Sequence, residues 1–257
     1  MTPLADRTDP PITPVIIKTK PEAVVWPEGE RMFYVLGSNG LYICRNHGFF
    51  KSCAPARDWP SELAEQESFL LPDYPKIPRE AFERIVGFFD RIGELHGSEA
   101  SVILAWDPTR RCVEIVVPRQ TGTVYTSSTT GKPHPIGLHY YPPTDLPPEW
   151  IVFGDVHSHV NLSAYASATD KSDEEYSPGL HIVVGRLDTE PPEIHIDAVV
   201  DGTRFPIERE DVIEGYHERS RDVPQAWIDK VEVELEEYSS WSYSTSYGGA
   251  GGAHDAP

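Results

Sequence analysis

The stretch Gly-Asp-Val-His-Ser-His at residues 154–159 completes an apolar run, Trp150–Val156, that is predicted to be a strand. Side chains two positions apart on an extended chain point the same way, so His157 and His159 are expected to share one face. Asp170 follows on a short predicted helix, from which its carboxylate can reach the two imidazoles. Three protein ligands with one open position are typical of a hydrolytic zinc site, whose water loses a proton near neutral pH.

Each part of this pattern also has a purely structural interpretation. Two histidines two positions apart on a strand can simply form a polar outer face. Ser167-x-x-Asp170 is a capping box, in which Ser167 caps the helix and Asp170 is its third residue. A capped helix start would fix the direction of the Asp170 carboxylate, so capping and metal ligation are compatible. The four residues at this spacing together favour a metal site over a chance match.

The elements around this stretch predict a mixed α+β fold. Pro78 opens the clearest helix, Arg79–Leu95, whose apolar residues recur every three or four positions and which is followed by Gly97. Helix, strands, helix and strands alternate along the chain, an order typical of an α+β or α/β sandwich. The predicted strands are Ser101–Trp106, Val113–Val117, Ile136–Tyr141, Trp150–Val156, His181–Leu187 and Glu193–Val200, and the second helix lies near Ala168–Tyr176.

The chain that precedes Pro78 differs in composition and in its pattern of apolar residues. Residues 1–21, rich in Pro, Thr and charge, are predicted to be a disordered lead-in. Residues 22–77 are predicted to form a small β-rich module with a linker. Within it, Met32–Leu36 and Leu41–Cys44 flank an Asn-Gly hairpin signal, and Phe49-Phe50 offers a third strand.

Two segments follow the last predicted strands. Residues 207–238 are charged with scattered apolar positions, and they are predicted to be a helical extension. Residues 239–257 are rich in Ser, Tyr and Gly, which predicts a flexible tail.

Composition excludes several classes of function. The 257 residues include 22 Lys+Arg and 41 Asp+Glu, a formal net charge of −19. Nucleic-acid binding rests on clustered Lys and Arg, so no nucleic-acid partner is expected. The sequence has no apolar run of about 18 residues and no apolar signal core, so we expect no membrane span and a cytoplasmic location.

The cysteines are three in number and lack C-x-x-C spacing. Cys44, Cys53 and Cys112 therefore predict neither a disulfide scaffold nor a cysteine-built zinc site. The neighbouring Arg110-Arg111 is expected to lower the pKa of Cys112, although no partner pattern suggests a cysteine nucleophile.

The segment His-Ser-His-Val-Asn-Leu-Ser-Ala-Tyr-Ala-Ser-Ala-Thr-Asp at residues 157–170 resembles the JAMM motif of the JAB1/MPN+ metalloproteases, zinc isopeptidases that include deubiquitinases. The resemblance covers residues 78–206, where the helix and residues 98–104 resemble the family's helix and its Glu-bearing strand. It implies an MPN/JAB (cytidine deaminase-like) α/β sandwich for residues 78–206. The layout, with its β-rich N-terminal extension, is similar to that of the protein A family of bacterial plasmid-associated PRTRC cassettes.

The resemblance also implies a role for each site residue. His157, His159 and Asp170 would ligate Zn²⁺, and Glu99 would be the general base. Ser167 would donate a hydrogen bond to the tetrahedral oxyanion. Glu94 and Glu114 remain rivals for the role of the base. The family usually has Pro after the second histidine, whereas this chain has Val160, which puts the shape of the following loop in question.

The remaining histidines have weaker patterns. His134 and His139 flank a Pro-rich loop and could line a cleft, although the more common outcome for such residues is a surface position. His181 and His195 lie in predicted strands and are expected to be packed or exposed polar residues.

The activity that the resemblance implies is hydrolysis of an amide or isopeptide bond after a ubiquitin-like C-terminus. A ubiquitin-like protein or its conjugate is then the expected partner. The alternative is a non-catalytic MPN-like scaffold that binds a ubiquitin-like protein, and inactive relatives typically lack a metal ligand. A third alternative, hydrolysis of a small molecule such as a cysteine conjugate, would need a deep closed pocket.

Overall fold

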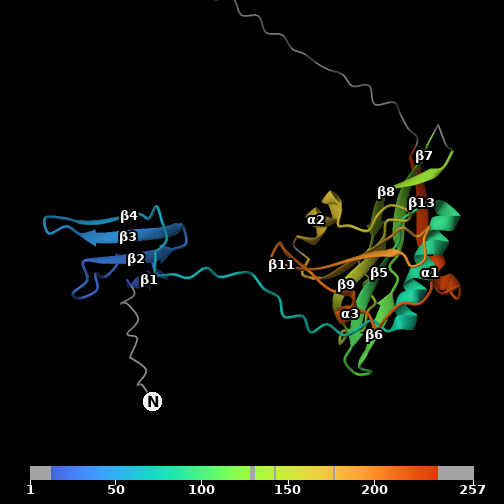
Figure 1. Cartoon of the computed structure of the whole chain (residues 1–257), viewed down its shortest axis with the longest axis horizontal. Helices are drawn as coiled ribbons and strands as arrows, with labels where there is room; N and C mark the ends of the chain where they lie inside the picture. The colour runs from blue at the N-terminus through green and yellow to red at the C-terminus, as the bar shows by residue number, and fades with distance from the viewer. Residues whose placement is uncertain (1–12, 128–130, 142, 176, 237–257) are drawn as a thin grey trace, which may run out of the picture. The chain divides into compact units, whose positions relative to one another are not determined.

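The computed structural model describes residues 13–127, 131–141, 143–175 and 177–236. The chain divides into two compact units, Met1–Phe69 and Leu70–Pro257 (Figure 1). The predicted tail at 239–257 and residues 1–12 of the predicted lead-in lie outside the described residues.

The first unit is one four-stranded sheet in the order β1-β2-β3-β4. Its strands are β1 (Val15–Ile17), β2 (Met32–Gly37), β3 (Gly40–Asn46) and β4 (Lys51–Pro55). The hairpin of β2 and β3 forms as the Asn-Gly signal predicts, but its two turn residues are Ser38 and Asn39, because Gly40 already pairs with Gly37. Phe33, Val35 and Cys44 form its small core.

Two predictions for this unit were wrong. The lead-in contains β1, because the short apolar run Val15–Ile17 pairs in parallel with β2, a contact that no local pattern reveals. Phe49-Phe50 is not a strand. Both rings are exposed in the turn that precedes β4. The third strand is instead β4, whose sequence Lys-Ser-Cys-Ala-Pro shows no clear alternation of apolar and polar residues.

In the second unit, α1 (Arg79–His96) matches the predicted helix. Its apolar face is buried from Phe82 to Ile92, and Phe82, Ile85 and Phe89 belong to the main core. The helix ends at Gly97, which adopts a left-handed φ of 65° and donates its N–H to Gly93 O at 2.8 Å.

A mixed six-stranded sheet forms the centre of this unit, in the order β12-β11-β10-β9-β5-β6. Only β9 and β10 are parallel, and α2 (Ala168–Glu174) lies in the connection between them. The fold is therefore of the mixed α+β kind that the sequence predicts. The strands are β5 (Ser101–Asp107), β6 (Cys112–Val116), β9 (Ile151–Ser158), β10 (Gly179–Gly185), β11 (Glu193–Val200) and β12 (Thr203–Pro206).

The two faces of this sheet have opposite chemistry. Even-numbered residues such as Val102, Val156 and Ile182 belong to the core that includes the apolar face of α1. In the parts of β5, β9 and β10 near the site, odd-numbered residues point the other way, and in register Ser101 lies opposite His157 while Asp155 lies beside His181. Strand alternation therefore places the polar residues on the face of the sheet opposite α1.

A three-stranded sheet, β13-β7-β8, completes the unit. Its strands are β7 (Gln120–Thr126), β8 (Pro133–Tyr140) and β13 (Val231–Glu236), and β13 runs parallel to β7. The sequence reasoning missed β7, which contains Gly122 and few large apolar residues.

The predicted helical extension at 207–238 is also corrected. The structure has two single-turn helices there, α3 (Arg209–Val212) and α4 (Gln225–Ile228), followed by β13. The sequence Val-Glu-Val-Glu-Leu-Glu of β13 alternates with a period of two, which favours a strand rather than a helix. No helix in the described part of the chain is long and apolar enough to cross a membrane.

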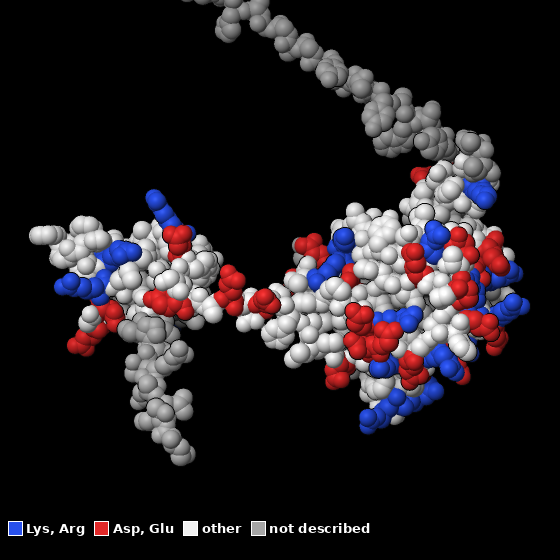
Figure 2. All heavy atoms as spheres, in the orientation of Figure 1, with Lys and Arg blue, Asp and Glu red and all other residues white. Residues whose placement is uncertain are grey.

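On the face drawn in Figure 2, Lys and Arg side chains are interspersed with Asp and Glu over both units.

Candidate metal centre

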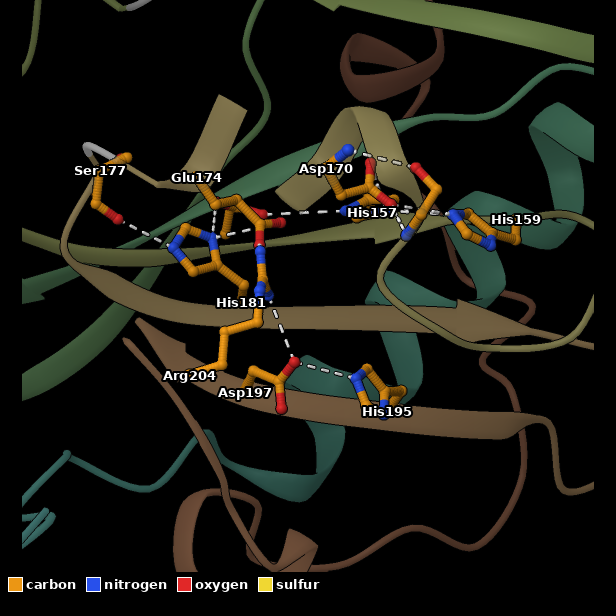
Figure 3. A network of polar contacts seen from close by, with 11 residues as sticks. His157, His159, Asp170, Glu174, Ser177, His181, His195, Asp197 and Arg204 are labelled. Carbon is orange, nitrogen blue, oxygen red and sulfur yellow. Dashed lines mark hydrogen bonds and ion pairs between the residues drawn. The ribbon is translucent and has the colours of Figure 1, made fainter. Parts of the chain in front are cut away.

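His157, His159 and Asp170 converge on one point (Figure 3). The Nε2 atoms of the two histidines are 3.4 Å apart. Asp170 Oδ1 lies 3.6 Å from His157 Nε2, and Asp170 Oδ2 lies 3.5 Å from His159 Nε2. Both imidazoles are buried. The structure therefore brings together the three residues that the sequence singles out as ligands.

The spacing of these three groups is close to that of a zinc site, because one ligand atom from each residue lies within 4.8 Å of the others. Nitrogen and oxygen ligands at about 2.0–2.1 Å from zinc, placed on a tetrahedron, lie about 3.4 Å from one another. The orientation of the His159 ring also fits, because its Nδ1 lies 3.2 Å from Ser163 O, a carbonyl that can only accept. Nδ1 donates to that carbonyl, so Nε2 is the ring nitrogen that remains for a metal ion.

The electrostatics explain why a cation suits this point. Burial lowers the pKa of His157, but its interactions with the nearby carboxylates of Asp155 and Asp170 outweigh burial and raise the pKa to about 10. Burial raises the pKa of Asp170, whereas the two histidines and Ser167 hold it far below its usual range. The site thus stabilises a positive charge, which either a proton or a metal ion can supply.

Asp170 is oriented by the start of α2. Asp170 N–H donates to Ser167 Oγ at 3.2 Å, and Ser167 N–H donates to Asp170 Oδ2 at 2.6 Å. This is the capping box that the sequence predicts, with both reciprocal bonds present. Because Ser167 Oγ accepts from the backbone, its own hydroxyl hydrogen remains available to a ligand.

Glu99 lies between α1 and β5 and lines the same cavity as the three candidate ligands. Burial raises the pKa of its carboxyl, while His159 and His157 act in the opposite direction. Glu94 and Glu114 do not line this cavity: Glu94 is exposed beside Arg91, and Glu114 pairs with Arg110. Of the three glutamates weighed for the base, only Glu99 is close to the histidines.

The backbone around Glu99 is held tightly. Ala100 N–H donates to Ser158 Oγ at 3.1 Å, and Ser158 N–H donates back to Ala100 O at 2.9 Å. On the other side, β7 approaches so closely that a Cβ at Gly122 would lie 1.8 Å from Ser98 Oγ. These contacts fix the chain on both sides of Glu99.

The cavity that holds the site has a volume of about 250 Å³. One wall is β8, which contributes Ile136, Leu138 and Tyr140. Burial raises the pKa of Tyr140 to about 12, so its phenol is protonated at neutral pH. His134 and His139 also lie on β8 but are not among the residues that line the cavity, contrary to the possibility raised above.

A second polar cluster consists of Asp155, Glu174 and His181. Figure 3 shows Glu174 and His181 next to the candidate ligands. His181 Nδ1 is 2.8 Å from Asp155 Oδ2 and its Nε2 is 3.0 Å from Ser177 O. A carboxylate and a carbonyl both accept, so both ring nitrogens donate and His181 is an imidazolium. Burial lowers its pKa, but Asp155 and Glu174 raise it overall.

This cluster is balanced without a metal ion. Glu174 pairs with Arg204, which also lies 3.2 Å from Asp197 Oδ2, and Asp197 accepts from His195 at 3.0 Å. Sequence reasoning expected only packed or exposed roles for His181 and His195. The sequence did hold a signal for this cluster, since Asp155, His181 and Asp197 all have odd numbers and alternation places them on one face. That signal could be used only once the order of the strands in the sheet was known.

Asp155 connects the cluster to the candidate ligands. Its Oδ1 lies 3.9 Å from His157 Nδ1, while its Oδ2 bonds His181. That distance exceeds a hydrogen bond but allows electrostatic attraction. A carboxylate behind a histidine directs Nε2 toward a metal and raises the basicity of the ring.

Val160 confirms that the loop after the second histidine is unusual. It adopts a positive φ of 50°, which is rare for a β-branched residue. Proline, fixed near −65°, could not take this conformation. At Val160 this chain therefore adopts a backbone conformation that is closed to proline, and Leu187 N–H donates to Val160 O at 2.9 Å.

Two further features carry no site of their own. Cys112 was expected to have a lowered pKa, but burial and Glu114 raise it. A larger cavity of about 700 Å³ lies beside α1 and residues 218–228. Its central Arg219 already bonds Asp90 at 2.6 Å and Glu190 at 2.7 Å, so it offers no free cation to a ligand.

No family model matches the chain, and no curated protein matches it. Among solved structures, a JAB1/MPN domain protein from Archaeoglobus fulgidus is similar to it, with 19% sequence identity and a TM-score of 0.32. The match covers 53% of this chain and 98% of that chain. This similarity identifies neither a family nor an activity, so the function is inferred from the geometry of the site.

Proposed function

We propose that this protein is a JAMM-type zinc metalloprotease, a hydrolase that cleaves an amide or isopeptide bond after a ubiquitin-like C-terminus. The observation that carries the proposal is the convergence of His157, His159 and Asp170 at 3.4–3.6 Å from one another, beside Glu99. His157, His159 and Asp170 would hold the metal as three protein ligands, which is the number that a catalytic zinc site uses while one position stays open for water.

The chemistry would be divided between the metal and the chain. When bound, zinc would polarise the scissile carbonyl and acidify the attacking water. Glu99 would take the proton of that water and deliver it to the departing amine, which is too basic to leave unprotonated. Its raised pKa suits this exchange near neutral pH. The free hydroxyl hydrogen of Ser167 would stabilise the oxyanion.

The wall formed by β8 supports a chain-like substrate. In the described sheet, β8 is an edge strand, and it runs along the cavity that contains the ligands. An extended peptide can pair with an exposed strand edge through its backbone and place alternate side chains in pockets. An extended C-terminal tail, such as that of a ubiquitin-like protein, fits this mode. The similarity in layout to the PRTRC protein A family suggests the ubiquitin-like protein of such a cassette as the substrate.

The test combines metal analysis with cleavage of a linear ubiquitin-like fusion and an isopeptide conjugate. Purified protein should contain about one zinc ion per chain, and His157→Ala or His159→Ala should abolish it. Glu99→Gln should retain zinc but cleave at least about 100-fold more slowly. Glu94→Gln, at an exposed position near the end of α1, is the matched control and should behave like the native protein.

Other outcomes would refute parts of the proposal. Unchanged zinc in both histidine variants would exclude this metal site. Loss of zinc from Glu99→Gln would make Glu99 a ligand rather than the base. Zinc binding without cleavage of any conjugate would favour the non-catalytic scaffold. The cytoplasmic location and the ubiquitin-like partner stay predictions.

A further inference from the structure

Cys44 and Cys53 are direct neighbours in the first unit. In the antiparallel pair of β3 and β4, the structure places Cys44 opposite Cys53. Directly opposed residues point to the same face of a sheet, so the two thiols face the same side. Both cysteines are free.

The backbone bonds identify the kind of position that they occupy. His47 N–H donates to Phe50 O at 2.9 Å, and Ala56 N–H donates to Leu41 O at 2.9 Å, so both of these opposed pairs are hydrogen-bonded. Such pairs alternate with pairs that are not hydrogen-bonded. The pair Cys44 and Cys53 lies three positions from each of these two hydrogen-bonded pairs. It is therefore a non-hydrogen-bonded pair, in which Cα atoms lie about 4.5 Å apart.

This spacing permits a disulfide bond. Disulfides join residues with Cα atoms about 4.4–6.8 Å apart, so the pair lies at the short end of the allowed range. The side chains already interact, since burial first and then a hydrogen bond with Cys53 raise the pKa of Cys44 to about 12. No rearrangement of the sheet is needed to bring the two sulfurs together.

The two thiols differ in access. Cys44 is 1% exposed and packs in the core with Phe33 and Val35, whereas Cys53 is exposed on the edge strand β4. A soluble reagent therefore meets Cys53 first, and Cys44 can react only with what is attached to Cys53.

We propose that Cys44 and Cys53 form a dithiol site that low-molecular-weight disulfides oxidise reversibly to a cross-strand disulfide. In the first exchange the Cys53 thiolate attacks the reagent disulfide, forms a mixed disulfide and releases one thiolate. Cys44 then gives its proton to solvent and attacks the Cys53 sulfur, which expels the second thiolate. The two cysteines together lose two electrons and two protons, and the reagent is reduced to two thiols.

The bond would have a local structural effect. It would tie the edge strand β4 to β3 across the turn that contains Phe49 and Phe50, and so limit fraying of that edge. Disulfides that are exposed or closely spaced are among those reduced most readily, so the change would be reversible by thiols. This inference does not depend on the proposed metal chemistry, because the two cysteines belong to the first unit.

The test uses the full-length protein with Cys112→Ser, which removes the only other cysteine of the chain. Oxidised glutathione is added, free thiols are counted, and peptides are mapped without reduction. Both remaining thiols should be lost together, with a Cys44–Cys53 linked peptide and a mass lower by two hydrogens. Dithiothreitol should restore both thiols.

Single variants complete the experiment. Cys44→Ser should stop at a stable glutathione adduct on Cys53, and in Cys53→Ser the buried Cys44 should remain a free thiol in the folded protein. A lasting adduct on Cys53 in the presence of Cys44 would overturn the proposal. Disulfide-linked dimers, or unchanged thiols at an excess of oxidised glutathione, would overturn it as well.

Discussion

The side-chain amide of Gln120 bonds both backbone polar groups of Ser101. Ser101 N–H donates to Gln120 Oε1 at 2.7 Å, and Gln120 Nε2 donates to Ser101 O at 3.0 Å. Gln120 is only 2% exposed, so these bonds replace those that water would make. Ser101 is two residues from Glu99, and the amide of Gln120 therefore supports the backbone that carries the proposed base.

Replacing Gln120 with Leu should destabilise the protein. Gln120→Leu leaves the buried Ser101 N–H without its partner, at a cost of about 1–3 kcal/mol in the free energy of unfolding. Urea denaturation would measure the loss. Gln225→Leu, an exposed glutamine of the same unit, should change stability by less than about 0.5 kcal/mol. Equal stability of the two variants would show that the Gln120 bonds contribute nothing.

Asp155→Asn should weaken metal binding without removing a ligand. An amide attracts the His157 ring less than a carboxylate does, so the affinity for zinc should fall about 10–100-fold. Competition with a chelator of known affinity would measure it. Asp188→Asn, a half-exposed aspartate paired with Arg186, is the matched control. If both variants bound zinc equally well, Asp155 would have no role in orienting His157.

Metal affinity should rise with pH. The pKa of His157 is raised to about 10 from 6.5, so in the metal-free protein this ring carries a proton at pH 7. Zinc must displace that proton, and each unit of pH decrease should therefore weaken binding about tenfold. Zinc titrations at pH 6, 7 and 8 would test this. An affinity that did not change with pH would mean that His157 is neutral before zinc binds.

Ser167 has two functions that different substitutions separate. Ser167→Ala removes both the helix cap and the hydroxyl, so it should cost about 1 kcal/mol of stability and slow cleavage about 100–1,000-fold. Ser167→Asp retains a good cap, but its carboxylate has no hydrogen to donate. It should therefore be as stable as the native protein and as slow as Ser167→Ala. Full activity of Ser167→Asp would exclude the oxyanion role.

The candidate site could be predicted largely because its signals are local. His157 and His159 are two residues apart, Asp170 and Ser167 share one helical turn, and the structure brings them together. The helix Arg79–His96 was equally accessible, since its 18 residues show one apolar face.

What the sequence could not predict depends on contacts between distant residues. The Asp155–His181 bond joins residues 26 positions apart through the parallel pairing of β9 with β10. The bonds of Gln120 and the strand β1 likewise exist only because other strands lie beside them. The strand β13 is a different case, because the sequence itself shows its period of two. The prediction of a helical extension followed the high charge of this segment instead.

Side chains alternate between the two faces of the sheet along β9, so the position of a residue in the strand decides whether it packs in the core or faces the cavity. Val156 belongs to the core and lies between Asp155 and His157, which face the cavity. Lengthening the strand by one residue ahead of Asp155 would exchange the two sets, turning the imidazole toward α1 and an isopropyl group toward the ligands. Lengthening it by two would restore both sets. The pairing of β5 with β9 is irregular near Ala105, where a β-bulge before Gly154 accommodates one extra residue. Because this bulge precedes Asp155, the side chains of the ligands still point into the cavity.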